Sequence, residues 1–239
     1  MTHLFIKSLA FLTVCPILAN CTNRQTNNNQ QPNIIYIMSD DHAYQAISAY
    51  GHGLNETPNI DRLAEEGALF TRSTVTNSIS APSRAVLLTG RHSFLNGKID
   101  NAEPFDWNQQ NFPKLMQQNG YQAAMIGKIH LNGNPQGFDF SMVLIGQGDY
   151  YNPDFLINGK KERKEGYCTE IITEATLDWL KNKRDPNKPF CVLYHQKAPH
   201  RNWQPAPKYL TLYDDVTFEP PATFFDDYEG RGTAAKEQQ

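Results

Sequence analysis

The chain has 239 residues, of which 39% are hydrophobic and 20% are charged, a balance typical of a globular protein with a sizeable core. Its formal net charge is -3 at pH 7. This charge argues against a broad basic surface, so we expect no nucleic acid among the partners. A local basic pocket remains compatible with the composition.

The first 20 residues resemble an export signal, because Lys7 precedes an apolar run from Leu9 to Ala19. This run is shorter than the roughly 20 residues that a membrane-spanning helix needs. The sequence "LANC" that ends at Cys21 resembles a bacterial lipobox, in which Cys21 is lipidated and becomes the mature N-terminus. We therefore predict a lipoprotein of the periplasm or outer membrane, attached by its lipid anchor only. Ordinary secretion is the alternative.

Residues 21–32 are polar and show no apolar periodicity, so we predict a flexible tether between the anchor and a folded domain at 33–239. The domain contains Cys168 in a predicted helix start and Cys191 in a predicted strand. Two small buried thiols are favoured over a disulfide between them.

From residue 33 onward, apolar runs of strand type alternate with segments of helical period, which is typical of an α/β domain. We predict a mixed, largely parallel sheet sandwiched by helices. The predicted strands are residues 33–38, 121–127 and 190–196. The predicted helices are 57–67, 112–120, 169–182 and a short helix that ends at Gly90. We expect Gly67 to close the first of them in a left-handed conformation.

Polar side chains follow each predicted strand at its carboxyl end, where open α/β sheets bind their ligands. The residues in question are Asp40 and Asp41 after the first strand, Lys128 and His130 after the second, and Lys197, His200 and Arg201 after the third. Ser80 lies at the start of the short helix, where free backbone N–H groups favour an anion.

Each of these residues also has a purely structural explanation. Asp40 and Asp41 could cap the next segment, Ser80 could be a helix N-cap, and either His130 or His200 could be a core histidine bonded to backbone. Their convergence on one edge of the sheet favours a functional site.

Four motifs carry a resemblance to a known family. Ser80, Pro82, Ser83 and Arg84, followed by "LLTGR" at 87–91, resemble the signature of the type I sulfatases of the alkaline phosphatase superfamily. The first residue of that signature is a cysteine or serine that is converted to formylglycine. Three further stretches resemble other family motifs in the family's order: "SDDHAYQAISAYG" (39–51), "GKIHLNG" (127–133) and "KAPHRNW" (197–203).

The resemblance implies a specific chemistry for residue 80. The hydrate of the formylglycine aldehyde carries two hydroxyls on one carbon. One hydroxyl attacks the sulfur and becomes sulfated, and the sugar oxygen leaves. The other hydroxyl is then deprotonated, re-forms the aldehyde and expels sulfate, so no second S–O hydrolysis is needed.

The resemblance also assigns roles to the other residues. Asp40 and Asp41, with the modified Ser80, would hold a Ca²⁺, for which hard oxygen ligands are suitable. Lys128 and His200 would contact the sulfate or the leaving oxygen. In the remaining roles, Arg84 would hold the hydrate, His130 would serve as base, His200 would donate a proton to the leaving alcohol and Arg201 would meet an acidic group of the substrate.

The family supplies partners and a substrate class as well. In it, the serine form is matured by a radical S-adenosylmethionine enzyme in anaerobes, which implies an oxygen-poor bacterial host. The stretch "KAPHRNWQPAPKYL" (197–210) most resembles the glucosamine-6-sulfatase branch. The expected substrate is therefore a sulfated carbohydrate, 6-sulfated N-acetylglucosamine from heparan-type glycosaminoglycans.

Family members also run beyond the length of this chain and contribute later metal and sulfate ligands, so we expect the domain to be C-terminally incomplete and weakly active or inactive alone. Two alternatives stay open. One is a phosphoesterase of the same superfamily, and the other is a truncated, non-catalytic lipoprotein that binds sulfated glycans.

Overall fold

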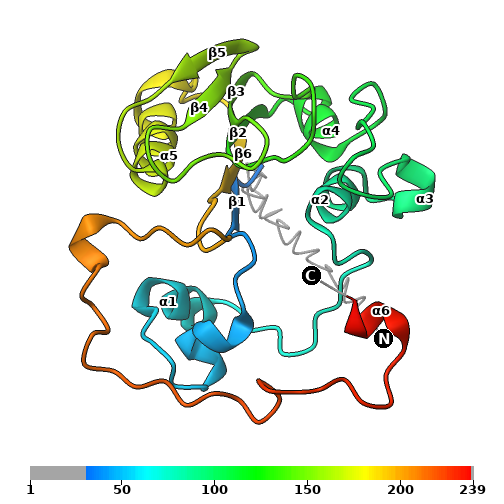
Figure 1. The fold of residues 1–239 in the computed structure, drawn as a ribbon. Coiled ribbons are helices and arrows are strands. Elements are labelled where there is room, and N and C mark those ends of the chain that lie inside the picture. The colour runs from blue at the N-terminus through cyan, green and yellow to red at the C-terminus, as the bar shows by residue number, and fades with distance from the viewer. Residues whose placement is uncertain (1–30, 238–239) are drawn as a thin grey trace, which may run out of the picture. The chain divides into compact units, whose positions relative to one another are not determined.

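The computed structural model describes residues 31–237 (Figure 1). The predicted signal at 1–20, the predicted lipidation site Cys21 and the tether up to Gln30 lie outside the described residues. Within the described part, no helix is both long and apolar enough to cross a membrane.

The centre of the fold is a six-stranded sheet in the order β1-β6-β2-β3-β4-β5. The pairs β1–β6, β6–β2 and β2–β3 are parallel, whereas β4 pairs antiparallel with β3 and β5 pairs antiparallel with β4. This arrangement confirms the predicted mixed, largely parallel sheet. The strands are β1 (Ile34–Met38), β2 (Gln122–Gly127), β3 (Phe140–Leu144), β4 (Asp154–Ile157), β5 (Lys160–Arg163) and β6 (Phe190–His195).

Helices cover both faces of the sheet (Figure 1). On one face, α2 (Ser80–Thr89) and α4 (Phe112–Gln118) pack over Met125 and Leu193. On the other face, α5 (Cys168–Asp178) and the helical turn η3 (Trp179–Lys183) pack over Ala124 and Val192. Parallel strands buried on both faces read as continuous apolar runs, which is why the sequence predicts β2 and β6 so clearly.

Two helices end at a glycine, but the two glycines are needed for different reasons. Gly90 closes α2 with a φ of 65°, the left-handed conformation that glycine adopts without strain. Gly67, which follows α1 (Pro58–Glu66), has a φ of -133°, so the predicted left-handed closure is wrong. A Cβ at Gly67 would lie 2.8 Å from the Leu63 carbonyl oxygen. Close backbone approach therefore explains this glycine.

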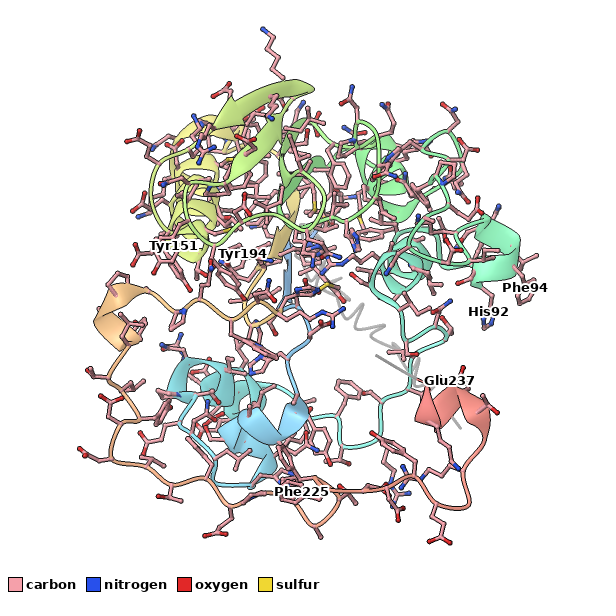
Figure 2. All side chains as sticks on the ribbon, viewed as in Figure 1. His92, Phe94, Tyr151, Tyr194, Phe225 and Glu237 are labelled. Atoms are coloured by element: carbon pink, nitrogen blue, oxygen red, sulfur yellow. The ribbon has the colours of Figure 1, made fainter. Side chains whose placement is uncertain are left out.

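The remaining elements are short. They are the 3-10 turns η1 (Tyr44–Ala46), η2 (Ser48–Tyr50) and η4 (Pro207–Tyr209), and the helices α3 (Ser93–Asn96) and α6 (Thr233–Lys236). His92 and Phe94 stack at α3 with ring centroids 5.6 Å apart, and the Phe225 side chain of the C-terminal segment is exposed (Figure 2).

The two cysteines of the described residues are free and buried, as predicted. Cys168 opens α5, and Cys191 lies in β6. Burial raises the pKa of the Cys168 thiol to about 12 and that of Cys191 to about 11. Both thiols therefore serve as packing groups.

Candidate active site

The site begins where three adjacent parallel strands end. Since β1, β6 and β2 are neighbours in that order, the residues that follow them meet at one edge of the sheet. Backbone hydrogen bonds continue past the strands. The Asp40 N–H donates to the Ala198 carbonyl at 3.1 Å, and the Lys128 N–H donates to the His195 carbonyl at 2.9 Å. The strand-end residues are therefore held by the sheet.

Asp40 is the buried centre of this edge. Its Oδ1 accepts from Arg84 Nη2 at 2.9 Å, and its Oδ2 pairs with Lys128 Nζ. Burial alone would raise the pKa of the Asp40 carboxyl, but Arg84 and Lys128 outweigh it and hold the pKa below its ordinary value. Arg84 Nη1 also donates to the Lys128 carbonyl at 2.6 Å. A residue of α2 and the residues that follow β1 and β2 thus form one charged network.

Ser80 is the first residue of α2, and its hydroxyl faces His130. His130 Nδ1 lies 2.9 Å from Ser80 Oγ. Burial, reinforced by the charges of Lys128 and Arg84, lowers the pKa of His130 to about 4. The imidazole is therefore neutral at pH 7, with one nitrogen that donates and one that accepts a hydrogen bond.

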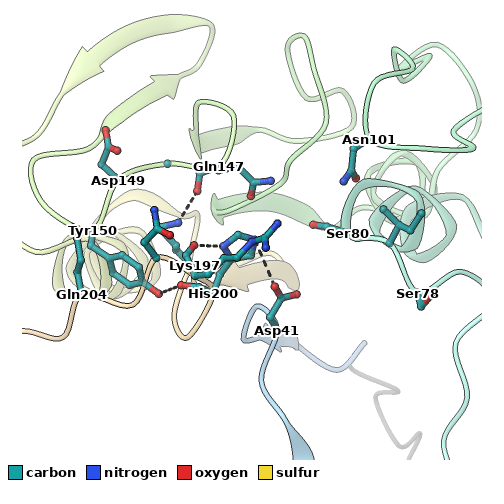
Figure 3. A pocket seen from close by; sticks show the side chains of 14 residues that line it. Asp41, Ser78, Ser80, Asn101, Gln147, Asp149, Tyr150, Lys197, His200 and Gln204 are labelled. Carbon is teal, nitrogen blue, oxygen red and sulfur yellow. Dashed lines mark hydrogen bonds and ion pairs between the residues drawn. The ribbon is translucent and has the colours of Figure 1, made fainter. Parts of the chain in front are cut away.

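Ser80 is among the residues that line a pocket of about 940 Å³ (Figure 3). Asp41, Lys197 and His200 line it, together with Arg201 from the following loop. His200 Nε2 lies 3.5 Å from Asp41 Oδ2, and the Tyr150 hydroxyl donates to the His200 carbonyl at 2.5 Å. The cationic side chains Lys197 and Arg201 thus share the pocket lining with Ser80 and with the carboxylates Asp41 and Asp149. The two cations can bind an anionic group of a substrate by charge-assisted hydrogen bonds.

The charge network, the pocket and the His130–Ser80 contact together include all the site residues that the sequence predicts within 31–237. Arg84, Lys128 and Asp40 lie in the buried network, whereas Asp41, Ser80, His200 and Arg201 line the pocket. The contacts place these residues but assign no chemical role to them. A second acidic pair, Asp214 and Asp215, is exposed.

Gln147 belongs to the site and was not predicted. Its Oε1 accepts from Lys128 Nζ at 2.6 Å, and its Nε2 lies 3.2 Å from His130 Nε2. Gln147 follows β3, so it sits at the same carboxyl edge as the other site residues. Its position could have been inferred from the apolar run of β3, because Gln147 follows that run. However, β3 is not among the strands predicted from the sequence.

The described residues do not by themselves fit the calcium ion that the family resemblance implies. Both carboxylate oxygens of Asp40 are engaged by Arg84 and Lys128. Within residues 31–237 there is also no group of three or more His, Cys, Asp or Glu side chains placed to hold a metal. Since Ca²⁺ takes roughly six to eight oxygen ligands, Asp40, Asp41 and residue 80 would supply only part of a shell.

A helix-covered, largely parallel sheet with a hydroxyl residue and charged side chains at its carboxyl edge is an α/β domain with its candidate site where such sheets bind ligands. The fold is that of the alkaline phosphatase-like proteins. A comparison with protein families matches the description "Sulfatase" over residues 32–228. The chain belongs to the sulfatase family.

Relatives and solved structures agree with this assignment. The chain is 55% identical over 224 residues to an N-acetylglucosamine-6-O-sulfatase of Bacteroides thetaiotaomicron, covering 92% of this chain and 40% of the relative. It is 32% identical to an N-acetylgalactosamine-6-O-sulfatase of the same organism, covering 81% and 38%. It also matches the solved structure of BT4656 with its substrate D-glucosamine-2-N,6-O-disulfate, with a TM-score of 0.83, 56% identity and coverage of 86% and 42%. The chain thus spans about two-fifths of the length of these relatives.

Proposed function

We propose that the protein is a sulfuric ester hydrolase that removes sulfate from a carbohydrate. The observation that carries this proposal is the 2.9 Å contact between His130 Nδ1 and the Ser80 hydroxyl. Ser80 opens α2 and is the first residue of the sulfatase-like signature, so the residue expected to react is in contact with a neutral imidazole. Membership of the sulfatase family supports the reaction type.

The proposed nucleophile is a formylglycine made from Ser80 by a radical S-adenosylmethionine enzyme. Arg84 would position residue 80 by tying the first turn of α2 to Asp40. Lys128 and His200 would bind oxygens of the sulfate or of the leaving group, where negative charge develops. The roles of His130 as base and of His200 as proton donor follow from the family resemblance and stay predictions.

Calcium is part of the proposal through two residues of this chain. Asp40 and Asp41 would contribute carboxylate oxygens beside residue 80, and the ion would supply positive charge for the sulfate. The Asp41 side chain is 60% exposed and lies at the pocket. The rest of the ligand shell would come from groups beyond the described residues.

The proposed substrate is a 6-O-sulfated N-acetylglucosamine of heparan-type glycosaminoglycans. A relative with 55% identity is named an N-acetylglucosamine-6-O-sulfatase, and a structure with 56% identity holds a 6-O-sulfated glucosamine. Arg201, in the exposed loop that lines the pocket, is the candidate partner for a second acidic group of the sugar. A lipoprotein attached through Cys21 in the periplasm or outer membrane would meet such polymers as they enter the cell.

The test is release of sulfate by the native protein, purified from its own anaerobically grown host. We expect turnover of N-acetylglucosamine-6-sulfate, with little turnover of the matching 6-phosphate. Preference for the phosphate would support the phosphoesterase alternative. Tight binding of the sulfated sugar without turnover, unaffected by EDTA and by Ser80→Ala, would support a glycan-binding protein and sink the proposed hydrolysis.

A further inference from the structure

Gln147 is held in place at both ends. It lies between Gly146 and Gly148, whose φ values of 59° and 68° make a tight turn directly after β3. Lys197 Nζ donates to the Gln147 carbonyl at 3.1 Å, as Figure 3 marks. A Cβ at Gly148 would lie 2.8 Å from a Leu144 methyl group, so the turn needs glycine there. The backbone of Gln147 is therefore fixed at the rim of the pocket.

The orientation of the Gln147 amide follows from its partner Lys128. A lysine ammonium can only donate, so the amide atom 2.6 Å from Lys128 Nζ must be the carbonyl oxygen. The amino group of the amide then faces His130 Nε2, at 3.2 Å. An amide amino group can only donate. His130 Nε2 must therefore accept a hydrogen bond and carry no hydrogen.

The hydrogen of a neutral imidazole then sits on the other nitrogen, Nδ1, which lies 2.9 Å from Ser80 Oγ. In this chain of hydrogen bonds each residue donates to the next: Lys128 to Gln147, Gln147 to His130, and His130 to residue 80. We propose that Gln147 is a positioning residue that holds His130 as its Nδ1–H tautomer, so that His130 donates a hydrogen bond to the side-chain oxygen of residue 80.

The chemical consequence rests on the proposed function. Before any reaction, the Nδ1–H of His130 donates to the side-chain oxygen of residue 80 and stabilises negative charge on that oxygen. It can take a proton at Nδ1 only after it has changed tautomer, and that change breaks its hydrogen bond with Gln147. Gln147 thus stabilises the tautomer in which Nδ1 of His130 is a donor. The tautomer itself can be measured without any turnover, so failure of the proposed function would leave this inference testable.

The experiment is nitrogen NMR of the full chain carrying ¹⁵N-labelled histidine, produced aerobically so that Ser80 stays unmodified. The two ring nitrogens of His130, assigned by comparison with His130→Asn, report which of them carries hydrogen. In the parent protein we expect a protonated Nδ1 and a bare Nε2. In Gln147→Glu, a carboxylate oxygen replaces the amino group, so we expect the Nε2 signal to shift to its protonated position.

Gln204→Glu is the matched control, because it makes the same chemical change in another glutamine that lines the same pocket. It should leave His130 Nε2 bare. A protonated Nε2 in the parent protein, a bare Nε2 in Gln147→Glu, or the same shift in Gln204→Glu would each overturn the inference. If Gln147→Glu does not fold, Gln147→Met serves instead, and loss of the single Nδ1–H form is the expected result.

Discussion

Arg84 Nη2 donates to Asp40 Oδ1 at 2.9 Å, although the two residues are 44 positions apart in the chain. Both side chains are buried, at 3% and 5% exposure. The contact joins the helix that begins at Ser80 to a residue two positions beyond the first strand, which ends at Met38. The same residues that the family resemblance assigns to catalysis therefore also stabilise the edge of the sheet.

Replacing Asp40 should therefore cost much more stability than replacing its neighbour. In Asp40→Asn, Arg84 and Lys128 lose their carboxylate, and an unpaired buried charge costs about 3–5 kcal/mol. In Asp41→Asn, an exposed contact with His200 is lost, worth at most about 1 kcal/mol. Urea unfolding of the two variants measures both values. Equal losses would mean that the buried network is not a structural unit.

Gly127 should tolerate no side chain. Its φ is 113°, and a Cβ would lie 1.8 Å from the His195 carbonyl oxygen of the neighbouring strand. We expect Gly127→Ala to destabilise the fold by more than about 2 kcal/mol, because strain and overpacking add. Gly90→Ala is the control, since its Cβ would meet open space, and left-handed strain alone costs about 1 kcal/mol. Thermal unfolding measures the loss of stability in each variant. Equal losses would contradict the close approach between Gly127 and the His195 carbonyl.

The stability of the protein should fall as the pH is lowered below 6.5. Burial, with the charge of Arg84 in the same direction, lowers the pKa of His195 from 6.5 to about 3. Between these values the unfolded chain binds a proton that the folded protein does not. This difference lowers stability with falling pH through that window and has no effect above it.

The expected slope is at most about 1.4 kcal/mol per pH unit for this histidine. Urea unfolding at a series of pH values, with His195→Gln as the variant, measures it. His130, with its pKa lowered to about 4, adds a contribution of the same sign. The matched control is His52→Gln at an exposed position, which should keep the slope of the parent protein. The slope in His195→Gln should be smaller than that of the parent protein, and an undiminished slope would assign the effect to other groups.

The two buried thiols should resist alkylation in the folded protein. With the pKa of Cys168 raised to about 12 and that of Cys191 to about 11, almost no thiolate forms near pH 8. Peptide mass spectrometry after iodoacetamide treatment should find both residues unmodified in buffer and modified in urea. Rapid labelling of either thiol in buffer would show that the packing around it is open.

The sequence predicted the sheet through its buried strands and missed the antiparallel hairpin. The segments of β2 and β6 are apolar runs buried on both faces, so composition alone identifies them. The hairpin of β4 and β5 is half exposed, but its turn carries Asn158 and Gly159, both at positive φ. Asn-Gly between two strands is a strong hairpin signal, and it was present in the sequence.

Within the site, residue type decided what could be predicted. Aspartate, lysine and histidine after a strand suggest chemistry, so Asp40, Lys128 and His200 could be found. Gln147 carries no such signal, because its importance depends on distances to Lys128 and His130 that only the fold sets. Helical periodicity also predicted α1 correctly. It did not predict how far the helix is exposed, since Leu63 on its apolar face is 57% exposed.

The most direct test of the account is peptide mass spectrometry of residue 80 in the native protein from its anaerobic host. The account predicts a Ser80 peptide two hydrogens lighter than its sequence requires, the mass of formylglycine, in protein that releases sulfate from N-acetylglucosamine-6-sulfate. An unmodified serine in protein that nevertheless releases sulfate would contradict it, because the nucleophile would then be another group.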